Sequence, residues 1–298
     1  MDKLIHFKEV NEMAIEYVDI LLDGVNLREE YGIYRVAEND GYNEKGLPDL
    51  DAKTADNSGS NGQYWFKTNY KTKTFEFNIA YDSLYRYKLF EFIQKFSVNS
   101  YHTLILAEQP YKQYYVRVDN VPEFTYVPFD DYERETEQTV YKGTGTLYFI
   151  ADDPFAYSIS KKKSDFSNDP FYNDWIVGSG LKDLTGYDSY SNGTIKLYNG
   201  GQLPTDYILH CSGASKNITI NLYDTDLSTI LTTYNIENSP SEFYINSKTH
   251  LIGNKNFTIL YGNFYKEIPT IVPIPVGESK ITFNGIASAD IDYKYKYF

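Results

Sequence analysis

Side chains that commonly perform catalysis or bind metals are scarce in this chain. Its 298 residues include a single cysteine, Cys211, and four histidines. His210 and Cys211 are neighbours in a stretch typical of a strand. Successive strand side chains point to opposite faces, so these two cannot act together as a base and a thiolate. A single cysteine also excludes an intrachain disulfide and a cysteine-based zinc site.

The familiar catalytic and metal-binding motifs are missing from the sequence. No two histidines have a metal-ligand spacing, and there is no Gly-x-Ser-x-Gly, phosphate-binding glycine loop or His-Glu-x-x-His. Asp49 and Asp51, followed by Asp56 and Asn57, could collect calcium, but the glycine and terminal glutamate of an EF-hand loop are missing from their places, which favours a solvated loop. The two distant carboxylates of a glycosidase would leave no sequence motif. We expect no enzymatic activity, no cofactor and no metal site.

Aromatic residues in polar stretches are the remaining candidates for a binding role. Aromatic rings on the loops of a β-sandwich can stack on sugars or anchor a protein partner. The alternative is that they pack the stretch that carries them onto the sandwich. The candidates for partner or sugar contact are Phe171, Tyr172, Trp175, Tyr187 and Tyr190.

The composition favours β structure and disfavours nucleic-acid binding. Tyrosine (31) and phenylalanine (18) are abundant, as on pleated, half-buried surfaces. The formal net charge of −13 disfavours DNA binding, because affinity for a duplex comes mainly from lysine and arginine. The same sign suits a protein that lets DNA pass; alternatively, it only keeps the chain soluble. No apolar run could cross a membrane and no signal peptide is present, so we expect no membrane insertion and folding in a cytoplasm.

The chain is expected to form two domains. The strand-like stretch 143–150 ends at Asp152-Asp153-Pro154, and a polar stretch with Lys161-Lys162-Lys163 follows. Proline cannot donate to a strand ladder, so a domain ends here. The expected parts are an N-terminal domain at 1–157, a connector at 158–190 and a C-terminal domain at 191–298.

The first domain is predicted to combine strands with one helix. An apolar strand at 15–22 runs into an Asp23-Gly24 hairpin turn. Apolar residues recurring at three- and four-residue intervals predict a helix near 82–96, capped by Asp82 or Ser83. Further strands are expected at 74–79, 103–106, 113–118 and 143–150.

The second domain has no helical periodicity. Its short apolar stretches are separated by Gly, Asn, Ser and Pro, which is typical of an antiparallel sandwich of the jelly-roll or lectin-like kind. The expected strands are 194–198, 207–209, 217–222, 242–245, 257–260, 280–283 and 291–297.

An ordered set of short motifs spans nearly the whole chain. It comprises Gly62-Gln63-Tyr64 before the 74–79 strand, the helix from Tyr81 to Phe96, the strands with Val116 and Val118, the stretch 145–156, Leu197-Tyr198-Asn199-Gly200-Gly201 with Pro204, the stretch 277–283 and the terminal Tyr/Lys alternation. Because these motifs occur in this order, the chain resembles the distal tail protein family of long-tailed phages that infect Gram-positive bacteria.

The resemblance implies a mainly β protein. The implied domains are an N-terminal β-sheet or split-barrel-like domain with one α-helix, and a C-terminal galectin-like antiparallel β-sandwich. It implies a non-enzymatic virion protein of the tail tip, assembled in the host cytoplasm. Six copies would form a ring that joins the tail tube to the baseplate, lets DNA pass and docks receptor-binding or other host-adhesion proteins. The implied partners are the tail tube protein, the tail-associated hub protein and the receptor-binding protein of the same phage.

Two other classes of protein stay open at this point. A carbohydrate-binding adhesin or cell-wall polysaccharide-binding module would use the loop aromatics, but it leaves the helix-bearing first domain without a role. A polysaccharide hydrolase would need carboxylates in a cleft.

The polar segment 37–62 departs from the family's pattern. It is too long for an ordinary loop, so we expect an extended arm or hairpin that contacts the next subunit of a ring. The expected subunit-contact residues are Asn43, Asp49, Asp51 and Asn57. The channel wall should be negative or neutral, with Lys161 to Lys163 outside, because cations on it would hold phosphates.

Overall fold

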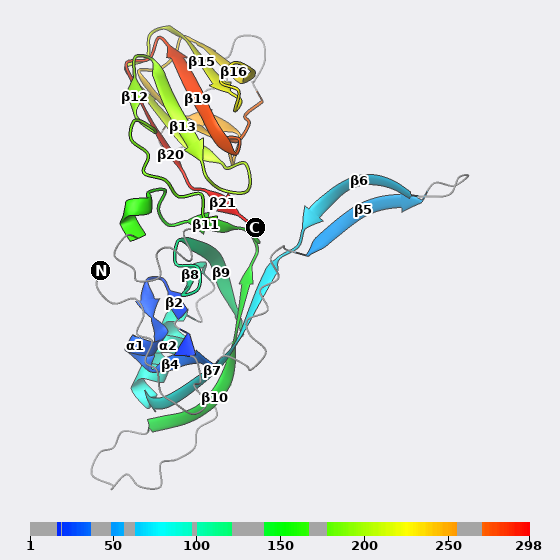
Figure 1. Cartoon of the computed structure of the whole chain (residues 1–298), viewed down its shortest axis with the longest axis vertical. Helices are drawn as coiled ribbons and strands as arrows, with labels where there is room; N and C mark the ends of the chain where they lie inside the picture. Colours follow the sequence, from blue (N-terminus) through cyan, green and yellow to red (C-terminus); the bar gives the residue numbers. More distant parts are fainter. Residues whose placement is uncertain are drawn as a thin grey trace. The chain divides into compact units, whose positions relative to one another are not determined.

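The computed structural model of the chain describes residues 17–18, 20–36, 49–56, 63–96, 100–120, 140–166, 178–254 and 270–298 (Figure 1). The chain divides into two compact units, Met1–Ala156 with Phe298, and Tyr157–Tyr297. Antiparallel strands dominate both units, as the composition predicts.

The first unit is a curled sheet of antiparallel strands. The strand order is β1 (Tyr17–Val18), β4 (Ile33–Val36), β7 (Lys73–Tyr85), β10 (Val140–Ala151), β9 (Lys112–Asn120), β8 (His102–Leu106), β2 (Ile20–Leu22) and β3 (Val25–Asn26). β1 and β2 are thus far apart in the order, yet Val18 and Ile20 can be separated by only about 7 Å of chain. The sheet must therefore curl until its ends approach each other, which agrees with the strong curvature of β7, β9 and β10 in Figure 1 and with the expected split barrel.

The strand expected at 15–22 is not continuous in the structure. Val18 pairs with Arg35 of β4, whereas Ile20 pairs with Leu106 of β8. The apolar run does form strand, as predicted. It is divided into β1, which pairs with β4, and β2, which pairs with β8, and this division depends on the curling of the sheet. The Asp23-Gly24 turn is confirmed between β2 and β3.

The helix begins later than predicted. α2 spans Arg86–Phe96, and the proposed caps Asp82 and Ser83 lie inside β7. The reason is the neighbouring strand: β10 continues to pair with β7 as far as Tyr85, opposite Val140, so this backbone is bonded in a ladder. Leu89, Phe92 and Phe96 form the buried stripe that the periodicity predicts.

A second, short helix was not predicted. α1 spans Leu27–Tyr31, where the Oδ1 atom of Asn26 accepts a hydrogen bond from the Arg28 backbone N–H at 3.0 Å. Gly32 ends the helix with a φ of 67°, a conformation that glycine adopts without strain. The ring of Tyr31 meets Phe92 of α2 edge-on, with centroids 5.4 Å apart.

The 37–62 region contributes one strand of a hairpin. β5 (Leu50–Asp56) pairs with β6 (Gln63–Tyr70), from Leu50 opposite Tyr70 to Asp56 opposite Gln63. Within the described part of the chain, these strands form a two-stranded sheet of their own, drawn in blue and cyan in Figure 1.

The second unit contains two antiparallel sheets. One has the order β12 (Tyr190–Ser191), β13 (Thr194–Asn199), β19 (Gly277–Asn284), β15 (Asn217–Tyr223) and β16 (Ile230–Glu237). The other has the order β18 (Leu251–Gly253), β17 (Glu242–Asn246), β14 (Tyr207–Ser212) and β20 (Ser288–Tyr293). β11 (Ala156–Ser158), the 3-10 helix η1 (Lys163–Phe166) and β21 (Lys296–Tyr297) complete the elements.

Alternate residues of both sheets fill the core of this sandwich. Ile220 and Tyr234 of the five-stranded sheet are buried, as are Tyr207, Leu209 and Phe243 of the four-stranded sheet. The hydroxyls of Tyr207 and Tyr234 lie 2.9 Å apart and link the two sheets.

The strand predictions for this unit need three comments. β16 was not predicted, because the polar residues Thr233, Asn235 and Glu237 interrupt its apolar ones and leave no continuous apolar run. The expected strand 291–297 is divided between β20 and β21. The expected strand 257–260 lies outside the described residues.

Candidate functional site

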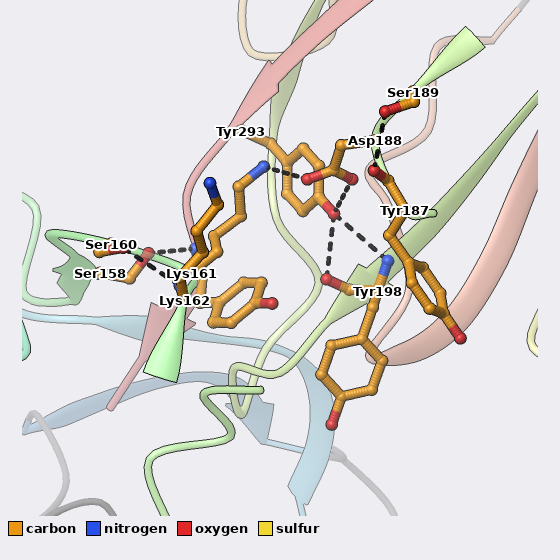
Figure 2. Close-up of polar contacts among 10 residues, drawn as sticks. Ser158, Ser160, Lys161, Lys162, Tyr187, Asp188, Ser189, Tyr198 and Tyr293 are labelled. Atoms are coloured by element: carbon orange, nitrogen blue, oxygen red, sulfur yellow. Dashed lines mark hydrogen bonds and ion pairs between the residues drawn. The ribbon is translucent and has the colours of Figure 1, made fainter. Parts of the chain in front are cut away.

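A polar cluster of the second unit is centred on Asp188, in the loop before β12 (Figure 2). Its Oδ2 atom lies 2.6 Å from the Lys161 ammonium, and its Oδ1 atom accepts the Tyr293 hydroxyl at 2.7 Å. The backbone of Asp188 is left-handed, with a φ of 58°, and its N–H donates to the Lys196 carbonyl at 2.8 Å. Three elements distant in sequence therefore meet at one carboxylate.

Burial determines the electrostatics of this cluster. Desolvation, with the nearby charge of Asp188, raises the pKa of Tyr293 far above that of a free phenol, so the hydroxyl stays a donor at any physiological pH. The Lys161 ammonium lies 3.7 Å from the centroid of the Tyr293 ring, a cation–π contact in addition to its ion pair. Lys161 and Asp188 are each 23% exposed. The cluster neutralises its own charge and holds the polar stretch against β20.

Backbone hydrogen bonds continue the attachment on either side of Lys161. Ser158 exchanges two bonds with Tyr295, each 2.9 Å long. Further along, the Lys163 N–H donates to the Lys182 carbonyl at 3.3 Å, next to an isolated bridge between Lys162 and Lys182. The two described ends of the 158–190 stretch are therefore joined to each other as well as to the sandwich.

The candidate aromatics that the structure describes use their polar atoms within the chain. The Tyr187 hydroxyl donates to Glu278 at 2.9 Å, and the Tyr190 hydroxyl donates to the Ile286 carbonyl at 2.6 Å. The Tyr190 ring packs edge-on against Phe283, with centroids 5.6 Å apart. These contacts favour the packing alternative for both tyrosines. Phe171, Tyr172 and Trp175 lie outside the described residues.

Two of the four candidate subunit-contact residues are described, and both belong to the hairpin. Asp51 pairs with Asn69 within the β5–β6 ladder, and the Asp49 carbonyl accepts the Lys71 N–H at 2.8 Å. Asn43 and Asn57 lie outside the described residues.

The predicted separation of His210 and Cys211 is confirmed. Cys211 is buried in the sandwich core, where desolvation strongly raises the pKa of its thiol. His210 lies on the opposite, solvent-facing side of β14, with Nε2 2.8 Å from Glu242.

One constellation with the residue types of a charge relay was missed in the sequence. His102 lies with Nδ1 2.7 Å from Asp23 and Nε2 3.3 Å from the Ser100 hydroxyl. His102 is only 5% exposed and packs edge-on against Phe96, and Asp23 also accepts the Thr103 N–H at 2.8 Å. The arrangement ties the β2–β3 turn to β8. Residues 79 positions apart leave no local signal, which is why the sequence analysis did not find it.

The described residues offer neither a metal-binding cluster nor a membrane-spanning helix. They contain no group of three or more His, Cys, Asp or Glu side chains placed to hold a metal ion. None of the helices in the described ranges has the length and apolar character needed to span a membrane.

Comparison with known proteins finds similarity to phage tail proteins. Residues 30–151 match the family model of the phage tail protein RIFT-related domain. The whole chain has the fold of Dit (gp 19.1) of phage SPP1, described as a paradigm of the hub adsorption apparatus in phages that infect Gram-positive bacteria. The TM-score is 0.59 at 11% identity, over 95% of this chain and 100% of that one. The expected resemblance to distal tail proteins is confirmed.

Other matches are weaker. The baseplate of phage P2 in its activated conformation with Ca matches with a TM-score of 0.43 at 10% identity, covering 94% of this chain and 98% of that one. No curated protein matches this sequence.

Proposed function

We propose that this chain is a structural protein of a phage tail tip. Six copies of the first unit would form a ring that joins the tail tube to the baseplate, and the second unit would hold receptor-binding or other host-adhesion proteins. The observation that supports this most is the end-to-end likeness to SPP1 Dit, over 95% of this chain and 100% of that one. The tail tube protein and the tail-associated hub protein of the same phage would be its neighbours, with assembly in the host cytoplasm.

The solvent-facing side of β7 and β10 is suited to a channel wall. Its described side chains include Thr74, Glu76 and Asn78 of β7, and Thr144, Thr146 and Tyr148 of β10. They form a polar ladder in which the Tyr148 hydroxyl donates to Glu76 at 2.9 Å and the Thr146 hydroxyl donates to Asn78 at 3.4 Å. These six residues include one carboxylate and no lysine or arginine, so such a wall would not hold DNA phosphates.

Light scattering of the purified full chain tests the ring. We expect a closed species with a mass close to six times 34.5 kDa for the chain alone, or a larger complex with six copies of the chain after addition of the tail tube protein. A chain that stays monomeric under both conditions, and that binds cell-wall polysaccharide, would instead support the carbohydrate-binding adhesin.

A further inference from the structure

The four-stranded sheet of the sandwich exposes a face that the packing of the core does not explain. The residues of β14, β17 and β20 that alternate with the buried ones form this face, which we call the His210 face. The strand register places His210 directly opposite Tyr244 on one side and Asp290 on the other. The members of the face are Ile208, His210, Ser212, Glu242, Tyr244, Asn246, Ser288, Asp290 and Asp292.

The His210 face is acidic. Its nine residues include three carboxylates and no lysine or arginine. The nearest cations in sequence, Lys248 and Lys294, follow the ends of β17 and β20. The solvent face of the other sheet is different, since it carries Lys196 and Lys280 as well as acidic residues. The charge of the His210 face is therefore a local property and does not simply reflect the net charge of the chain.

A planar stack lies at the centre of this face. The rings of His210 and Tyr244 are stacked with centroids 4.5 Å apart and an interplanar angle of 11°. Glu242 lies 2.8 Å from Nε2 of His210, and Asp290 lies 3.8 Å from Nδ1. Glu242 is 57% exposed and Asp290 is 84% exposed, so both carboxylates can accept further hydrogen bonds from outside.

This combination matches the chemistry of a guanidinium group. Arginine is planar and always charged, stacks on aromatic rings and donates in a fork to carboxylates, whereas lysine offers a single point charge. DNA and anionic cell-wall polymers carry the wrong sign for an acidic surface. Charge complementarity thus favours a basic protein segment.

We propose that the His210 face docks an arginine-bearing segment of a neighbouring tail-tip protein. The proposal rests on the proposed function, and it assigns to the second unit the surface and the chemistry of its partner. Arginine would insert its guanidinium beside the His210–Tyr244 stack and pair with Glu242 and Asp290.

Peptide binding to the full chain tests this proposal. The probes are a short arginine-rich peptide and a lysine peptide of the same length and charge, measured by calorimetry at low and at physiological salt. We expect tighter binding of the arginine peptide. The double variant Glu242→Gln/Asp290→Asn should weaken it about tenfold, since each exposed ion pair contributes up to about fivefold.

A matched control separates this face from general acidity. Glu237→Gln/Glu278→Gln removes two carboxylates from the exposed side of the other sheet and should leave peptide affinity unchanged. Equal weakening by both double variants, equal binding of the two peptides, or no binding at all would overturn the proposal. So would binding of a neutral cell-wall polysaccharide in place of the peptide, if Tyr244→Ala abolished it.

The same samples distinguish failure of the docking site from failure of the ring. Light scattering of the Glu242→Gln/Asp290→Asn variant should show the oligomeric state of the unaltered chain. Specific arginine-peptide binding by a chain that never forms a ring would support the docking site and contradict the conduit. A ring that binds neither peptide would support the conduit and contradict the docking site.

Discussion

Asp188 connects residues that lie far apart in the sequence. Lys161 is 27 positions away and Tyr293 is 105 positions away, yet both contact the same carboxylate. The Tyr293 hydroxyl also lies 3.3 Å from the Tyr198 N–H, which donates to it. Because Tyr293 is buried, water cannot easily replace these hydrogen bonds. The cluster should therefore contribute measurably to the stability of the second unit.

We expect Tyr293→Phe to lower the free energy of unfolding by about 1–3 kcal/mol, the usual cost of leaving buried polar groups unpaired. Urea denaturation of the full chain measures it. Tyr187→Phe is the matched control, because it removes an exposed tyrosine–carboxylate bond and should change stability by no more than about 0.5 kcal/mol. Equal losses in the two variants would show that burial of the Asp188 cluster adds nothing.

Asp23 should make the first unit sensitive to acid. Burial alone would raise the pKa of Asp23, but hydrogen bonds from His102 and Thr103 outweigh it and lower the pKa below its ordinary value. A carboxyl with a lowered folded-state pKa stabilises the fold above its unfolded pKa of about 3.9, and this stability is lost as the pH falls through the folded-state pKa.

Thermal unfolding between pH 5 and pH 2 tests this expectation. Asp23→Asn should be less stable than the unaltered chain at pH 5, and the difference should shrink as the pH falls. A constant difference across this range would mean that Asp23 acts through its turn geometry and not through its charge.

The β5–β6 hairpin is an element that the first unit does not need for its main sheet. Its strands pair with each other and, in the described residues, are not part of the main sheet of that unit. Long insertions that extend a compact domain usually have a function, and for a ring protein the next subunit is the natural contact.

A shortened hairpin tests the subunit contact. Leu50 lies opposite Tyr70, so replacing residues 51–69 by Asn-Gly should close the hairpin at that pair with a two-residue turn. We expect an unchanged melting temperature of the monomer but weaker oligomer formation in light scattering. An oligomer of undiminished stability would contradict the contact, and a lower melting temperature would show that the hairpin supports the fold.

Charge distribution over the whole molecule connects the acidity of the chain to its proposed role. The net charge of −13 does not by itself identify a channel. We propose the face of β7 and β10 as the location of the channel wall, because Thr74, Glu76, Asn78, Thr144, Thr146 and Tyr148 present hydroxyl, amide and carboxyl groups there.

One lysine on this face should convert a passive wall into a binding one. Thr144→Lys would place six ammonium groups in the channel of a hexamer, and we expect the assembled ring to retain duplex DNA, with an affinity that falls steeply as salt rises. Gel retardation measures the effect. Asn284→Lys adds the same charge to the exposed end of β19 and should not retain DNA. Equal retention by both variants would place the β7–β10 face outside the channel.

Local patterns in the sequence were sufficient for much of the fold. Alternation over 74–79 correctly predicted the buried row Phe75, Phe77 and Ile79, because a strand inverts its side-chain direction at every residue. The same rule separated His210 from Cys211. The Asp23-Gly24 turn and the buried stripe of α2 were also readable, since both depend on neighbours a few positions away.

Only the tertiary structure decided which distant residues meet. The start of α2 at Arg86 depends on β10, which keeps residues up to Tyr85 in a ladder, and the division of strand 15–22 depends on the curling of the sheet. The Asp188 cluster and the His210 face arise in the same way. Strand order and register set these contacts, and they are properties of residues tens of positions apart, which no local pattern of residue types records.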